Sequence, residues 1–238
     1  MKRLIVTISL AIIAGISFAQ DAQFSQFYAA PLYLNPAFAG TDSGARLGFN
    51  FRNQWPKILG QFITYDLEFD HHINALHSGF GVIAMKDEAG SGTMSTTTFG
   101  GMYSFQQHIY KELNISVGLE GAYMQENLDW SKYFPGDNQN PRFPCFDTVI
   151  QEIAPRGTTS FLDLSWGMLA YTKEFYAGIS LTHITEPNFS MISANCPLPM
   201  KTTANFGAMI PIDSGKVTTY LSPNLIIVQQ ENFQQVNL

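Results

Sequence analysis

The stretch that decides the fold is Ile63-Thr64-Tyr65-Asp66-Leu67-Glu68-Phe69-Asp70, in which apolar and polar residues alternate without interruption. Successive side chains of a β-strand point to opposite faces of the sheet, so the stretch predicts a strand with one apolar and one acidic face. The apolar face could meet lipid or the core of a soluble protein. The acidic face is typical of a polar barrel lumen, although paired carboxylates can also perform acid–base catalysis.

The same alternation recurs along the chain, and no helical periodicity of any length follows residue 20. Many of the predicted strands reach the ~9–11 residues that cross a bilayer at a tilt, whereas strands of soluble domains average ~5–6 residues. The predicted strands are 45–53, 61–72, 78–86, 93–107, 113–126, 160–171, 174–185, 201–211 and 217–229, with a tenth starting near 233.

The connections between these strands differ in length on the two rims of the predicted sheet. One rim has short connections, whereas the other has the long connections 127–159 and 186–200. Two smaller connections on the long-loop rim, 54–60 and 87–92, weaken this contrast without reversing it. Such asymmetry is typical of outer-membrane barrels. We therefore expect an all-β fold, an antiparallel transmembrane up-and-down β-barrel with about ten visible strands.

Composition also favours a membrane barrel. Charged residues make up 13% of the 238 residues, about half of the ~25% usual in soluble domains, while the hydrophobic share is 45%. No run of ~20 apolar residues follows residue 20, so a spanning helix is not predicted. The excess of 19 acidic over 13 basic residues argues against nucleic acid as a partner. A soluble β-sandwich remains open on composition alone.

The first 19 residues predict a cleavable signal peptide. Lys2 and Arg3 precede an apolar stretch from Leu4 to Ile16, and Ser17-Phe18-Ala19 forms a cleavage site. The alternative, a transmembrane anchor, is too short to span a bilayer comfortably. Removing Lys2 and Arg3 leaves 11 basic against 19 acidic residues, so the net charge changes from −6 to −8. We expect a signal peptide (1–19), an irregular aromatic segment (20–44) and a barrel (45–238).

Two cysteines, Cys145 and Cys196, lie in the two long connections of the same rim. Disulfides persist in exported proteins, and a bridge between the two loops is geometrically permitted. Two free thiols are the alternative.

No recognised catalytic or cofactor motif occurs in the sequence. We therefore expect no catalytic residue, no cofactor and no metal site. His71 and His72 point to opposite faces of a strand and could share an ion, with His77, only if the strand bulged; a solvated rim is the simpler interpretation. We interpret His183, at the end of a strand, as a hydrogen-bonded rim residue rather than a catalytic base.

The segment 20–44 is rich in amides and aromatic residues and contains Pro31, Pro36 and Gly40. Neither a long helix nor a central strand fits this pattern. A disordered tail is the alternative, but such tails contain few aromatic residues. We expect the segment to pack inside the barrel or at its periplasmic mouth.

Several motifs together resemble the PorP/SprF family of the type IX secretion and gliding machinery of Bacteroidota. The family signature Q-D-x-Q-F-S-Q…L-N-P-A-x-A-G is matched by residues 20–26 and 34–40, and a later strand matches Y-x-G-x-S-x-x-H-x-x-x-P. The matching positions are Gln23, Phe24, Ser25, Gln26, Asn35, Pro36 and Gly40 in the signature, Arg52 and Trp55 after the first strand, Asp87 and Gly90 in a D-x-x-G loop, and Gly178, His183 and Pro187 in the later strand.

The resemblance implies a non-enzymatic outer-membrane barrel that works beside the periplasmic secretion ring and peptidoglycan-associated lipoproteins. It also implies partnership with a secreted adhesin, without saying which role applies. Family members usually continue for several more strands, so we expect C-terminal strands of the barrel to be missing from the sequence. Two other classes remain open from the residues alone: a porin or solute transporter with a polar lumen, and a soluble exported β-protein.

Overall fold

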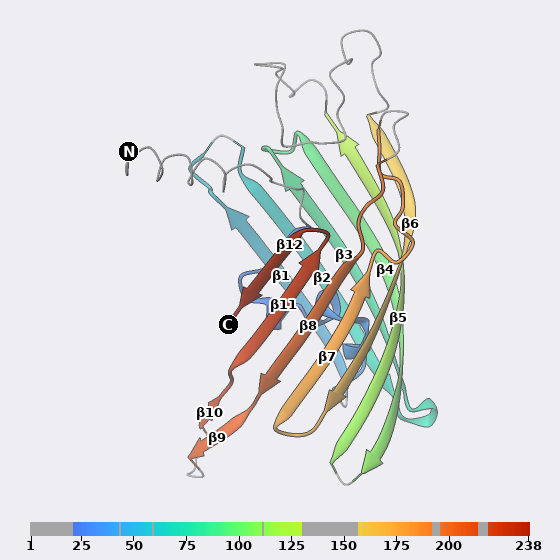
Figure 1. The fold of residues 1–238 in the computed structure, drawn as a ribbon, viewed down its shortest axis with the longest axis vertical. Helices are drawn as coiled ribbons and strands as arrows, with labels where there is room; N and C mark the ends of the chain where they lie inside the picture. Colours follow the sequence, from blue (N-terminus) through green and yellow to red (C-terminus); the bar gives the residue numbers. More distant parts are fainter. Residues whose placement is uncertain are drawn as a thin grey trace, which may run out of the picture.

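The computed structural model describes residues 21–42, 44–58, 60–110, 112–129, 157–191, 196–213 and 219–238. Ten strands form one antiparallel sheet in the order β1-β2-β3-β4-β5-β6-β7-β8-β11-β12, and β9 and β10 form a second sheet of two strands. Figure 1 shows the long, tilted strands curving around the blue N-terminal segment. The predicted all-β, up-and-down antiparallel architecture is confirmed. Among the described residues the edge strands β1 and β12 do not pair, so the sheet is not closed.

The strands are long, and β4 reaches 17 residues. They are β1 (Ala45–Gln54), β2 (Phe62–Ile73), β3 (Ser78–Ala89), β4 (Met94–Tyr110), β5 (Leu113–Leu128), β6 (Thr158–Tyr171), β7 (Phe175–Thr182), β8 (Lys201–Ala208), β9 (Ile210–Asp213), β10 (Thr219–Leu221), β11 (Asn224–Gln230) and β12 (Phe233–Asn237). The helical elements are short: η1 (Phe27–Ala29), α2 (Pro31–Leu34), η2 (Pro36–Phe38) and η3 (Asn74–Leu76).

Two predicted strands were wrong in their continuity. The strand predicted over 201–211 is divided into β8 and β9, and the strand predicted over 217–229 is divided into β10 and β11. Both breaks lie beside Pro223, which lacks the N–H needed for a strand ladder. Its carbonyl accepts a hydrogen bond from Ala208, while the amide of Met209 turns to the carbonyl of Glu174 at 2.6 Å.

The faces of β2 are reversed relative to a strand of a soluble protein. The polar side chains of the stretch 64–70 are at most 2% exposed, whereas the apolar side chains between them are 40–47% exposed. The buried polar residues are Thr64, Asp66, Glu68 and Asp70, and the exposed apolar residues are Tyr65, Leu67 and Phe69. An apolar outer face with a polar inner face is the pattern of a sheet whose outside meets lipid.

Residues 21–42, which we call the plug, lie against the inner face of the sheet, as the fold prediction expected. Leu32 and Ala39 of the plug pack with Ile83 and Met102 of the wall. The elements η1, α2 and η2 account for the helical turns of the plug. Among the described residues, no helix has the length and apolarity needed to cross a membrane.

The plug runs from one rim of the sheet toward the other. Its first described residue, Asp21, contacts His183 and Lys201, which flank the connection between β7 and β8. Its end contacts the opposite rim, because the Gly40 carbonyl lies 2.9 Å from His72 Nδ1 near the β2–β3 turn. We call the first rim, which also has the β5–β6 connection, the loop side, and the second the turn side.

Candidate functional site

The plug rests on a row of small residues that crosses five strands. Gly79, Ser104, Gly118, Gly167 and Ser180 are direct register partners from β3 to β7. A Cβ added to Gly118 would lie 2.4 Å from the backbone nitrogen of Ala37, and one added to Gly79 would lie 2.1 Å from the carbonyl oxygen of Ala39. The glycines therefore allow the backbone of the plug to lie directly on the backbone of the sheet.

Hydroxyl groups of the wall satisfy buried carbonyls of the plug. Ser104 Oγ donates to the Ala39 carbonyl at 2.6 Å, and Ser116 Oγ donates to the Ala37 carbonyl at 2.7 Å. Ser180 Oγ donates to the Leu34 carbonyl at 2.7 Å. A buried carbonyl without a partner costs free energy comparable to a lost hydrogen bond, so these serines fix the path of the plug.

Asn35 connects the plug to two strands at once. Its Nδ2 donates to the carbonyls of Met168 on β6 at 3.2 Å and Ile179 on β7 at 3.1 Å. Its Oδ1 accepts from the backbone of Ala37 at 2.9 Å, which caps η2. The side chain is fully buried, and a Cβ added to Gly178 would lie 3.0 Å from Asn35 Nδ2. Asn35 and Gly178, two of the signature positions, are therefore brought together.

The acidic face of β2 binds backbone donors of the plug. Glu68 accepts from the backbone nitrogens of Tyr33 at 3.0 Å and Leu32 at 3.4 Å. Asp70 accepts from the Gly40 nitrogen at 2.7 Å and from Arg46 Nε at 2.7 Å. Gly40 has a φ of +64°, a conformation that favours glycine. Two of the three acids that the alternation predicted as lumen lining, Glu68 and Asp70, thus have backbone partners in the plug, while Asp66 accepts from the side chain of Asn50.

The loop-side end of the plug is held by a cluster of charged groups. Asp21 Oδ2 lies 2.5 Å from Lys201 Nζ and 3.0 Å from His183 Nε2. His183 Nδ1 lies 2.8 Å from Asp163 Oδ2, and Lys201 Nζ lies 5.1 Å from the centre of the Tyr33 ring. We call Asp21, Asp163, His183 and Lys201 the charge cluster.

The charge cluster keeps Asp21 and His183 ionised. Burial opposes the charge of Asp21, but Lys201 and His183 outweigh it and hold the pKa of this carboxyl well below its usual range. Burial also opposes the charge of His183, yet Asp21 and Asp163 raise the pKa of this imidazole to about 9. His183 is therefore a cation at neutral pH. It is buried at 5% exposure, so the prediction of a hydrogen-bonded residue fits, although the residue faces the interior.

The geometry of His183 does not resemble that of a general base. A base that activates a serine needs a ring nitrogen within reach of the hydroxyl. Here one nitrogen faces Asp163 and the other faces Asp21. Among the described residues, no group of three or more His, Cys, Asp or Glu side chains is arranged to hold a metal ion.

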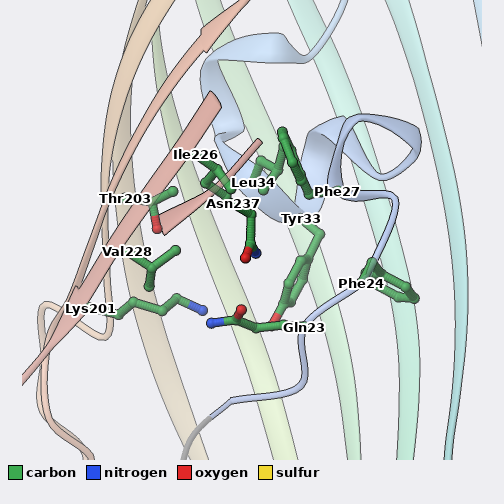
Figure 2. Close-up of a pocket in the computed structure, with 10 residues that line it drawn as sticks. All are labelled: Gln23, Phe24, Phe27, Tyr33, Leu34, Lys201, Thr203, Ile226, Val228 and Asn237. Carbon is green, nitrogen blue, oxygen red and sulfur yellow. The ribbon is translucent and has the colours of Figure 1, made fainter. Parts of the chain in front are cut away.

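A cavity of about 30 Å³ remains between the plug and β8, β11 and β12. Figure 2 shows the Lys201 ammonium and the Gln23 amide pointing toward each other beside Tyr33, with Phe27, Ile226 and Val228 on the apolar side. This volume holds about one water molecule. This cavity is therefore too small for a solute larger than water.

The chain matches the family model described as type IX secretion system membrane protein PorP/SprF over residues 16–238. The chain belongs to this family. It is thus a membrane protein of type IX secretion, and its β-rich structure with an apolar outer face fits the outer membrane. No curated protein and no solved structure matches the chain.

In this PorP/SprF protein the N-terminal signature positions separate into two groups. Phe24 is buried, and its ring packs edge-on against Tyr33 with centroids 5.7 Å apart. Pro36 is buried at the first position of η2. Ser25 and Gln26 are exposed and do not belong to the seat of the plug.

Five other signature positions lie away from the plug seat, toward the loop side. Asp87 accepts from Thr64 Oγ1 at 2.6 Å, the Arg52 guanidinium donates to Gln54, and Trp55 is 54% exposed. Gly90 has a φ of +65° in the β3–β4 turn, and the Pro187 carbonyl accepts from Leu198 at 2.9 Å.

The cysteine prediction stays untested. Cys145 lies outside the described residues, and Cys196 is not a free thiol.

Sequence reasoning missed the partners of the plug. Asp21, Asp163 and Lys201 gave no signal, because the contact between Asp21 and Lys201 joins residues 180 positions apart. The small-residue row was detectable in part, since the alternation places Gly118 and Ser180 on the face of the strand opposite its apolar residues. The alternation does not indicate that the plug backbone packs against that face.

Proposed function

We propose that this PorP/SprF protein is a non-enzymatic outer-membrane β-barrel that binds other proteins during type IX secretion. The plug is the observation that carries the proposal. It occupies the inner face along which a porin needs an open aqueous path, and serines, Asn35 and acids fix it there. A barrel whose inner face is occupied in this way is suited to work through its rims.

The proposal assigns one class of partner to each rim. The periplasmic secretion ring and peptidoglycan-associated lipoproteins would meet the turn side, and a secreted adhesin would meet the loop side. Export by a signal peptide cleaved after Ala19 would leave the plug at the start of the mature chain.

The hairpin of β9 and β10 supports a protein partner at the turn side. Ile212 is 65% exposed, and Tyr220 and Leu221 are each 54% exposed. Figure 1 shows the hairpin extending from the ends of β8 and β11. A two-stranded hairpin is at best marginally stable in water, so exposed apolar residues on it favour contact with another surface.

Crosslinking in the native bacterium tests the assignment. The tagged full-length chain is crosslinked in cells and purified, and captured proteins are identified by mass spectrometry. Wild type should capture components of the secretion ring, and Tyr220→Asp should capture several-fold less. Ile109→Asp is the matched control, because Ile109 is also exposed near the turn side, at 57%. Wild type that captures no secretion component would overturn the proposal.

The second candidate is a porin or solute transporter, favoured by the polar inner face of β2. Planar-bilayer recordings separate the two functions. The plugged barrel should give no steady conductance, and deleting residues 23–40 should produce one. Steady conductance of the wild-type protein would favour the porin.

A further inference from the structure

A carboxylate on the inner face of β5 has an oxygen without a partner. Glu126 lies two positions before the end of β5, at the loop side, and is 8% exposed. Its Oε2 is buried, and no donor from the described residues binds it. A buried charged acceptor that stays unsatisfied costs its full desolvation free energy. Such an oxygen therefore indicates that a further donor belongs there.

A second unpartnered group lies beside Glu126, on β4. Thr98 is also 8% exposed, and its Oγ1 has no partner within the described part of the chain. The register partner of Thr98 is Met124, which precedes Glu126 by two positions on the same face of β5. Side chains offset in this way are diagonal neighbours, roughly 7–8 Å apart. A small group with several N–H donors can therefore contact both.

The basic groups nearby are already engaged. The two cations of the charge cluster bind Asp21. Arg52 shares the register row of Glu126 from β1 to β5, and its guanidinium donates to Gln54. Across the described ranges, no set of three or more His, Cys, Asp or Glu side chains is arranged to hold a metal ion. The donor for Glu126 therefore comes from elsewhere.

The start of the plug lies next to Glu126. The carboxylate of Asp21 is close enough to that of Glu126 for the two charges to interact. Asp21 is fixed by the charge cluster, and the Ala22 carbonyl accepts from the Tyr33 hydroxyl. The residue before them, Gln20, is one Cα–Cα spacing of ~3.8 Å from Asp21. Its nitrogen is therefore confined to the region of Glu126.

Removal of the signal peptide would give Gln20 the donors that Glu126 lacks. This step rests on the proposed function, which includes cleavage after Ala19. The new chain end has an α-ammonium group and a side-chain carboxamide. An N-terminal glutamine can also cyclise, when its α-nitrogen attacks the side-chain carbonyl and ammonia leaves. The resulting lactam keeps an N–H group, so either form can donate to a carboxylate.

We propose that Glu126 and Thr98 form a binding site for the N-terminus of the mature chain, in which an N–H group of Gln20 donates to Glu126 Oε2. We call this site the N-terminal seat. It holds the chain end one residue before the charge cluster. In the uncleaved chain the same nitrogen carries the signal peptide, so the N-terminal seat accepts only the processed protein.

Peptidase digestion of the folded, full-length protein tests the N-terminal seat. Mass spectrometry of the first peptide establishes the starting residue and whether its end is open or cyclised. Aminopeptidase then removes an open end, and pyroglutamyl peptidase removes a cyclised one. Glu126→Leu should speed this removal about tenfold, the effect of losing one hydrogen bond to a charged group. Gln125→Leu is the matched control, because Gln125 is exposed on the opposite face of β5, and should leave the rate unchanged.

The variant Gln20→Ala identifies the donor, because alanine has neither a carboxamide nor a route to the lactam. If the α-ammonium group is the donor, adding Glu126→Leu to Gln20→Ala should still accelerate removal of the first residue. If the carboxamide or the lactam N–H is the donor, Glu126→Leu should have no effect in the Gln20→Ala chain.

Two failures are distinguishable. Equal removal rates for wild type and Glu126→Leu, in chains that start at Gln20, would overturn the N-terminal seat alone, as would equal acceleration in Gln125→Leu. A chain that starts at another residue would overturn the proposed cleavage together with the seat. Circular dichroism and heat-modifiable migration on gels establish that each variant is folded. Glu126→Gln, which keeps a carbonyl acceptor, should show a smaller acceleration than Glu126→Leu.

Discussion

The carboxylate of Glu68 lies 3.0 Å from the backbone nitrogen of Tyr33, 35 positions earlier in the chain. The contact joins the inner face of a spanning strand to the start of the short helix α2. The contact thus joins the alternating strand β2, which predicts the fold, to the aromatic N-terminal segment, which carries the family signature.

Replacing Glu68 by leucine should destabilise the protein by about 1–3 kcal/mol, because two backbone N–H groups lose a buried acceptor. Glu68→Gln should lose less, since its carbonyl still accepts a hydrogen bond. Urea unfolding in lipid vesicles, followed by tryptophan fluorescence, measures the difference. A leucine variant as stable as wild type would show that the contact does not hold the plug.

Gly118→Ala should displace the plug. Its Cβ would overlap the backbone of Pro36 and Ala37, and such overpacking costs about 1–3 kcal/mol. Chymotrypsin should then cut the aromatic plug several times faster than in wild type. Gly101→Ala is the control, because its Cβ meets nothing within 4 Å and should leave the cleavage rate unchanged.

Raising the pH should loosen the loop-side end of the plug. The pKa of His183 rises from its ordinary value of 6.5 to about 9 in the folded protein. The stabilisation by the cationic imidazole is therefore complete below about pH 6.5, declines above it and is lost as the pH passes about 9. Unfolding midpoints in urea between pH 6 and 10 should follow this decline. The His183→Asn variant should show a flatter profile, and an identical slope would contradict the role of His183.

The predicted bridge between Cys145 and Cys196 can be weighed directly. The intact chain, treated with an alkylating reagent before and after reduction, should take up the reagent only after reduction. Cys145→Ser should expose the thiol of Cys196 to the reagent without reduction. Uptake by unreduced wild type would favour two free thiols.

The sequence predicted the strands well because lipid and lumen impose opposite demands on neighbouring residues. Asp66 and Leu67 point to opposite faces, and their contrast is visible in any alternating stretch. The breaks at Met209 and Pro223 were harder to predict, since a proline at the end of a strand and one within a break look alike in sequence. His183 was assigned to the rim because nothing local indicates the two carboxylates that surround it.

Only the plug side of the candidate site could be predicted from the sequence, and the wall side could not. The signature positions Asn35, Pro36 and Gly40 were identified through the family resemblance, and all three lie in the plug seat. Their partners on the wall are serines and glycines, which are common residues without a motif of their own. Contacts such as Asn35 with Ile179 join residues 144 positions apart, a separation that alternation does not address.

The direction of the plug has a consequence for assembly. Its first described residue, Asp21, contacts His183 and Lys201, which come late in the chain. Gly40, near its end, is bound by Asp70 of β2 and Gln106 of β4. The ion pairs of Asp21 can form only after the strands that carry His183 and Lys201 have folded. Contacts of such high sequence separation make folding slow. Gly40 can pack as soon as β2 and β4 have formed, whereas Asp21 can pair only after His183 and Lys201 are in place. Complete packing of the plug therefore requires that the later strands have folded.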